Sequence, residues 1–79
     1  MPVIFRVGGF KFYFYSNEGE PREPIHVHVL KGGDKAKFSL NPVVVASNAG
    51  FDARTLRELA SIVENNTLRI ESAWNEYFG

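Results

Sequence analysis

The stretch IHVHVLKGGDKAKFSL, residues 25–40, decides the fold, because it has the pattern of a β-hairpin. Apolar and polar residues alternate on both sides of Gly32-Gly33, and a diglycine supplies the positive φ angles of a two-residue turn. Pairing outward from this turn gathers the apolar residues on one face: Ile25, Val27, Val29, Ala36, Phe38 and Leu40. The sequence therefore predicts antiparallel strands over 25–31 and 34–40, with one face buried.

A second diglycine, Gly8-Gly9, predicts another hairpin, with strands over 3–7 and 10–15. Regular pairing places Ile4 opposite Tyr13 and Val3 opposite Phe14. One face is then wholly apolar: Val3, Phe5, Val7, Phe10, Phe12 and Phe14. The segment 16–24 is polar and contains Gly and Pro, which predicts a surface loop. After the second hairpin, Asn41-Pro42 predicts a turn, and 43–46 a short edge strand.

The second half of the chain has the periodicity of two helices. One apolar stripe follows the i, i+3, i+4, i+7 rule: Leu56, Leu59, Ala60 and Val63. A second stripe has the same spacing: Ile70, Ala73, Trp74 and Tyr77. Asp52 is a natural N-cap for the first helix, and Asn66 is expected to cap the second. Both stripes need a cover, which the apolar face of the sheet supplies.

These elements predict an α+β fold. An antiparallel sheet of four to five strands, built on two Gly-Gly hairpins, carries two C-terminal helices on one face. We expect the helices to be antiparallel or sharply angled, because the link between them is short. The 79 residues suffice for one domain, 1–79, with the sheet in 3–46 and the helical pair in 52–78.

Composition excludes several classes of protein. The chain has no cysteine, which rules out disulfides and cysteine-ligated zinc. No apolar run approaches the ~20 residues of a membrane helix, and the first residues lack a signal-peptide pattern. We therefore expect a cytoplasmic protein without a membrane partner.

Strand alternation leaves the second face of the sheet uncovered, and we call it the open face. Because Val27 and Val29 occupy the packed side, His26 and His28 should both point to the open face. Aromatic and cationic residues are expected beside them: Arg6, Lys11, Tyr13, Tyr15, Lys35 and Lys37. The nine acidic residues lie in the 16–24 loop, at the second turn and around the helices, although the net charge is zero.

This charge pattern favours an anionic partner on the open face, with the tyrosines available for stacking. An acidic protein fits better than single-stranded RNA, because zero net charge weakens long-range attraction. The alternative is a plain solvated face, on which lysines discourage edge pairing.

The His-x-His pair raises two chemical hypotheses. Two imidazoles on one face of a strand can form half of a divalent-metal site, which needs a third ligand. The nearby candidates are carboxylates: Glu20, Glu23 and Asp34. Without a metal, the pair could act in general acid–base catalysis of RNA cleavage. The alternative is structural, with both rings hydrogen-bonded to Ser39 or to the loop and no cofactor present.

Three segments resemble one family of small bacterial proteins. They are PVIFRVGGFKFYFYSNEGEPREPIHVHV (2–29), KAKFSL (35–40) and WNEYFG (74–79). The most specific element is matched by Pro24, His26, Val27, His28 and Val29. On these residues the chain resembles domain of unknown function 4160. The resemblance implies a component of a two-gene cassette of the toxin–antitoxin type, whose partner is a small protein encoded by the neighbouring gene.

The favoured hypothesis is therefore a non-enzymatic protein-binding module, acting through the open face or a free edge strand. The rival is a small ribonuclease, metal-dependent or not, centred on His26 and His28. A third hypothesis is a homodimer that assembles through Ile4, Tyr13 and Tyr15.

Overall fold

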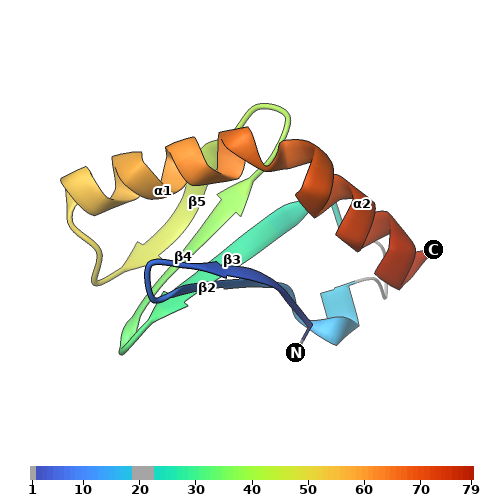
Figure 1. The fold of residues 1–79 in the computed structure, drawn as a ribbon, viewed down its shortest axis with the longest axis horizontal. Coiled ribbons are helices and arrows are strands. Elements are labelled where there is room, and N and C mark those ends of the chain that lie inside the picture. The colour runs from blue at the N-terminus through green and yellow to red at the C-terminus, as the bar shows by residue number, and fades with distance from the viewer. Residues whose placement is uncertain (1, 19–22) are drawn as a thin grey trace.

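The computed structural model describes residues 2–18 and 23–79, and it has the predicted α+β fold (Figure 1). The strands are β1 (Val3–Val7), β2 (Phe10–Tyr13), β3 (His26–Lys31), β4 (Asp34–Ser39) and β5 (Val44–Ala49). A short 3-10 helix, η1 (Ser16–Glu18), follows β2, and α1 (Ala53–Asn65) and α2 (Thr67–Phe78) come last. The sheet order is β1-β2-β3-β4-β5 with every pair antiparallel, so each strand neighbours the next one in the chain.

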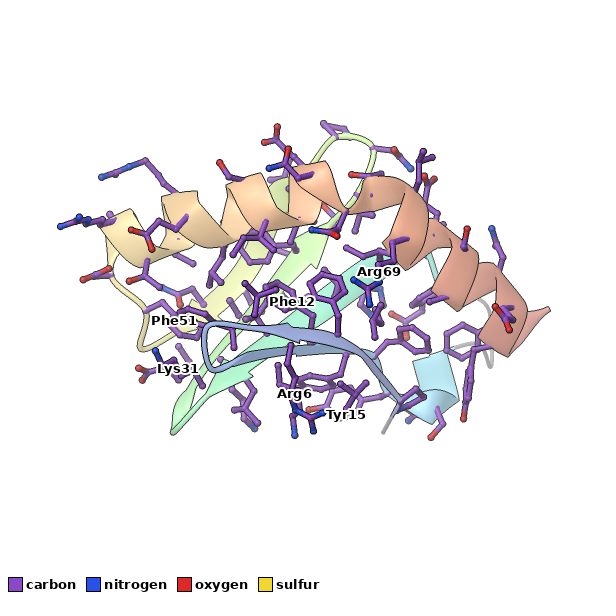
Figure 2. All side chains as sticks on the ribbon, viewed as in Figure 1. Arg6, Phe12, Tyr15, Lys31, Phe51 and Arg69 are labelled. Carbon is purple, nitrogen blue, oxygen red and sulfur yellow. The ribbon has the colours of Figure 1, made fainter. Side chains whose placement is uncertain are left out.

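Both helices lie on the same side of the sheet (Figure 1). The helix α2 continues beyond α1 at an angle, so of the two expected arrangements, antiparallel or sharply angled, the antiparallel one is wrong. Only Asn66 separates the two helices, which is too short a link for a reversal. In Figure 2, Phe12 and Phe51 lie between the sheet and α1, whereas Arg6 and Tyr15 point away on the opposite side.

The core lies between the sheet and the helices. It unites residues from all the strands except β5 with residues around and along the helices: Phe5, Phe12, Val27, Val29, Ala36, Phe38, Leu40, Phe51, Leu59, Val63 and Ile70. Phe5 and Phe12 stack across β1 and β2 with ring centroids 4.6 Å apart. The predicted stripe of α1 is confirmed, because Leu56 and Ala60 also pack against this core.

The second hairpin has the predicted register, with Val29 opposite Ala36 and Val27 opposite Phe38. The first hairpin departs from prediction at its open end. A β-bulge between Val3 and Phe5 pairs Val3 with Tyr13 and turns Ile4 toward the core. The expectation that Ile4 faces outward is therefore wrong, and β2 ends at Tyr13 rather than at residue 15.

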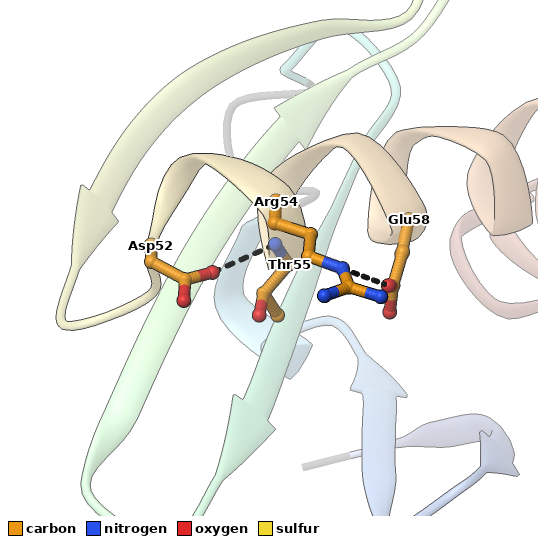
Figure 3. Close-up of polar contacts among 4 residues, drawn as sticks. All are labelled: Asp52, Arg54, Thr55 and Glu58. Carbon is orange, nitrogen blue, oxygen red and sulfur yellow. Dashed lines mark hydrogen bonds and ion pairs between the residues drawn. The ribbon is translucent and has the colours of Figure 1, made fainter.

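The two helix caps differ from each other. The carboxylate of Asp52 accepts a hydrogen bond of 2.8 Å from the backbone N–H of Thr55 (Figure 3). Hydrogen bonding by the side chain and then by the backbone of Thr55 lowers the pKa of Asp52 below its usual 3.8. Asn66 does not cap α2 with its side chain, contrary to expectation. Its amide instead donates to the Ile62 carbonyl, at 2.8 Å, and so satisfies the end of α1.

The edge strand β5 is longer than the predicted 43–46 and reaches Ala49. All six of its residues are exposed. The chain then turns at Gly50, whose φ is 110°, and enters α1. Among the described residues, no helix has the length and apolarity needed to cross a membrane.

Candidate functional site

Strand pairing arranges the open face in rows that cross the sheet. Directly opposed residues of antiparallel strands lie on the same face, so the register defines each row. The first row is Arg6, Lys11, Leu30, Lys35 and Ala49. The second row is Tyr13, His28, Lys37 and Ser47. The predicted binding residues of the strands are thus neighbours.

A pocket of about 270 Å³ opens on these rows. Its lining comes from β2, β3, β4, β5 and the residues after β2: Tyr13, Tyr15, His28, Lys35, Ala36, Lys37, Ser47, Asn48 and Ala49. We call it the open-face pocket. Among these lining residues none is acidic, and two are lysines. Five of the eight residues singled out from the sequence line it, whereas Arg6, Lys11 and His26 do not.

An aromatic cluster forms one side of the open-face pocket. The imidazole of His28 stacks on Tyr13, with centroids 5.3 Å apart and planes at 24°, and meets Tyr15 edge-on at 4.7 Å. The two tyrosine hydroxyls lie 3.3 Å apart. Tyr13 is 1% exposed, so the expectation that it presents its ring to a ligand is wrong. Tyr15, at 37%, remains exposed.

His26 occupies a different environment from His28. It is 3% exposed and packs edge-on against Trp74 of α2, at 5.1 Å, and against His28, at 5.2 Å. Its Nδ1 lies 2.9 Å from the carbonyl oxygen of Pro24, which can only accept, so Nδ1 carries the proton. The expectation that both imidazoles are exposed is therefore wrong for His26, because Trp74 covers it at the end of the sheet.

Cations crowd the first row of the open face. Arg6 lies directly opposite Lys11, and like charges in that position destabilise a sheet. The Lys11 ammonium lies 5.6 Å from the centroid of the Tyr13 ring, a cation–π contact that offsets part of this repulsion. The open face thus keeps a surplus of positive charge that an anionic ligand would neutralise.

The carboxylates considered as metal ligands lie in different places. Asp34 packs against Gly50 just after the β3–β4 turn. Its pairing partner Lys31 lies three residue steps along β3 from His28, a distance of about 10 Å. Glu23 is exposed just before β3. Glu20 lies outside the described residues. Within 2–18 and 23–79, no three His, Cys, Asp or Glu residues are grouped to hold a metal ion.

Sequence reasoning missed the contribution of β5 to the open-face pocket. Ser47, Asn48 and Ala49 line it, but the predicted edge strand stopped at residue 46. The sequence signal for the end of β5 was Gly50, because glycine interrupts strands and this one lies two residues before the Asp52 cap.

A second hollow of about 350 Å³ lies between the start of β1 and the end of α2. Its lining is mainly apolar: Pro2, Val3, Ile4, Phe14, Ala73, Glu76 and Tyr77. Ile4 is the one residue of the homodimer hypothesis in this lining, which among the described residues includes none of the predicted catalytic, metal-ligating or open-face binding residues. Among the described lining residues Glu76 is the one charged group, so the hollow offers little to orient a ligand.

The chain matches one protein family. The family model described as Domain of unknown function (DUF4160) matches residues 9–75, which include every residue that lines the open-face pocket. No curated protein and no solved structure matches the chain.

Proposed function

The chain belongs to the DUF4160 family, and we propose that it is a non-enzymatic binding module whose open face receives an acidic segment of a partner protein. One observation carries the proposal. The open-face pocket joins two tyrosines, an imidazole and two lysines, and no acidic residue is among its described lining. The exposed Tyr15 can contact a partner, since a tyrosine ring supplies contact area at a low entropic cost, whereas the buried Tyr13 supports His28 from below.

Charge supports an acidic ligand. Lys35 and Lys37 lie on one side of β4, and Arg6 and Lys11 oppose each other across β1 and β2. Carboxylates bound among them would form ion pairs and relieve the repulsion between like charges.

A protein ligand suits the site better than single-stranded RNA does. Base stacking needs an accessible ring face, but one face of Tyr13 is already stacked by His28 and the residue is 1% exposed. The net charge of zero also gives little of the electrostatic attraction on which RNA binding depends.

A ribonuclease is the rival function. Two-histidine acid–base catalysis requires both imidazoles to reach the reacting phosphate. His26 is 3% exposed and does not line the open-face pocket, so only His28 is placed to meet a substrate there. This difference is why we favour binding over catalysis.

We take the partner to be the small protein encoded by the neighbouring gene, in a cassette of the toxin–antitoxin type. The test is co-expression and purification of the pair, followed by affinity measurement with a Lys35→Glu/Lys37→Glu variant. We expect this variant to bind about tenfold more weakly, or worse, because two ion pairs become repulsive. Arg54→Glu/Arg57→Glu on α1 changes the net charge equally, away from the pocket, and should bind as the native chain does.

Two results would contradict the proposal. One is partner binding that the lysine reversal leaves unchanged. The other is RNA cleavage by the purified chain that His28→Ala abolishes, which would establish the ribonuclease instead.

A further inference from the structure

The last strand of the sheet has a free edge. Within the described part of the chain, β5 pairs only with β4, and all six of its residues are exposed. The outer edge of such a strand presents backbone N–H and C=O groups that can pair with another extended segment.

The two edges of the sheet differ in how they are protected. Natural edge strands are commonly blocked by charged side chains, proline or bulges. The other edge, β1, carries Arg6 as well as its bulge. The strand β5, with the sequence VVASNA, also has a bulge, but unlike β1 it contains no charged residue, and it contains no proline. Its first two residues are exposed valines, at 51% for Val44 and 40% for Val45.

A bulge limits where regular pairing along β5 can occur. The register with β4 shifts at Ala46, so uninterrupted pairing covers Ser47–Ala49. These same three residues form the outer wall of the open-face pocket. A segment added to this part of the edge would therefore lie directly beside the pocket.

Small side chains leave the lysines of β4 within reach across β5. Lys35 stands opposite Ala49, and Lys37 stands opposite Ser47. An added strand would lie two strand spacings from β4, about 9–10 Å. A lysine and a glutamate side chain together span that distance, and neither alanine nor serine is large enough to block them.

We propose that the acidic segment binds as a sixth strand, paired with Ser47–Ala49; this inference rests on the proposed function. Side chains of the segment opposite Ser47 and Ala49 point to the open face, where carboxylates pair with Lys37 and Lys35. The side chain between them, opposite Asn48, points to the helical side. The recognised pattern is therefore acidic-x-acidic in an extended conformation.

A second copy of the chain fits the edge less well. Symmetric pairing of two β5 strands would bring the lysines of both copies onto one face. The residues of β5 include no carboxylate that could pair with these lysines. Charge complementarity thus selects a different, acidic occupant.

The test uses a short capped peptide of alternating glutamate and valine, and the same peptide with every backbone amide N-methylated. The second peptide keeps its charge but cannot pair as a strand. We expect the first to bind the full chain and to slow amide hydrogen exchange within Val44–Ala49. N-methylation should weaken binding at least about tenfold, because backbone hydrogen bonds are lost. Lys35→Glu/Lys37→Glu should also weaken it.

Each other outcome contradicts one proposal or both. If binding needs the lysines but tolerates N-methylation, the proposed sixth strand is wrong, and the acidic segment binds on the open face without pairing to β5. Binding that ignores the lysines removes both proposals, as does no binding at all. Concentration-dependent protection of β5 without peptide identifies a second copy as the occupant. A single-stranded RNA that displaces the peptide from the lysines identifies a nucleic-acid site.

Discussion

His26 and His28 lie two residues apart on one strand, yet their surroundings differ. His28 is half-buried and lines the open-face pocket, whereas His26 is covered by Trp74. Strand alternation predicts that both point to the same face, and it cannot show that a residue near the end of the chain folds over one of them. The contact between His26 and Trp74 joins β3 to α2, and local patterns contain no information about such contacts.

This difference predicts separate effects of the two alanine substitutions. His26→Ala removes a buried ring and should lower the free energy of unfolding by roughly 2–4 kcal/mol. His28→Ala should cost less stability but weaken partner binding by about three- to tenfold. Urea unfolding and affinity measurements on both variants separate the two effects.

His26→Phe is the control, because it keeps a ring against Trp74 and loses the hydrogen bond to Pro24. It should recover most of the lost stability. The structural assignment of His26 is wrong if His26→Ala unfolds as the native chain does and yet abolishes partner binding.

At the scale of elements, the diglycine turn and the apolar alternation predicted the register of the second hairpin, and the bounds of its strands to within one residue. The first hairpin shows the limit of the method. Val3 and Ile4 are both β-branched and apolar, so a bulge that exchanges their orientations leaves the sequence pattern unchanged. The end of β5 was missed for a similar reason. Ser47 and Asn48 resemble loop residues, and only their pairing with β4 makes them strand.

The turn from β5 into α1 makes a testable contact with the β3–β4 hairpin. Gly50 has φ 110°, and a Cβ there would come within 2.7 Å of the Asp34 Cγ. Gly50→Ala should therefore lower the free energy of unfolding by about 2–3 kcal/mol, from backbone strain and this clash. Thermal or urea unfolding measures the loss.

Gly8→Ala is the matched control, since its φ is also positive, at 54°, but the space around it is empty. It should cost about 1 kcal/mol from the left-handed conformation alone. In an Asp34→Ala background, the penalty of Gly50→Ala should shrink. An unchanged penalty there would show that backbone strain, and not the Asp34 contact, accounts for the whole effect.

At the scale of the molecule, zero net charge conceals a separation. Lysines and one arginine gather on the open face without an acidic neighbour on the strands there. The helices mix four glutamates with three arginines: Glu58, Glu64, Glu71, Glu76, Arg54, Arg57 and Arg69. This separation followed from the sequence, because strand alternation and helix boundaries were enough to assign charges to layers. The open-face pocket could not be predicted from the sequence. Its outer wall depends on the full length of β5, and its aromatic side depends on ring contacts among Tyr13, Tyr15 and His28.

The charge separation predicts how salt affects partner binding. Raising salt from about 50 to about 500 mM shortens the Debye length and should weaken affinity by about tenfold, through the lysines of the open-face pocket. The association rate constant should change much less, because a molecule without net charge exerts little long-range attraction. Most of the effect should then lie in the dissociation rate constant, which surface plasmon resonance resolves.

Lys35→Glu/Lys37→Glu should flatten the salt dependence of the affinity. An association rate constant that falls as steeply as the affinity would mean that the open face attracts its partner from a distance, despite the acidic residues on the opposite side.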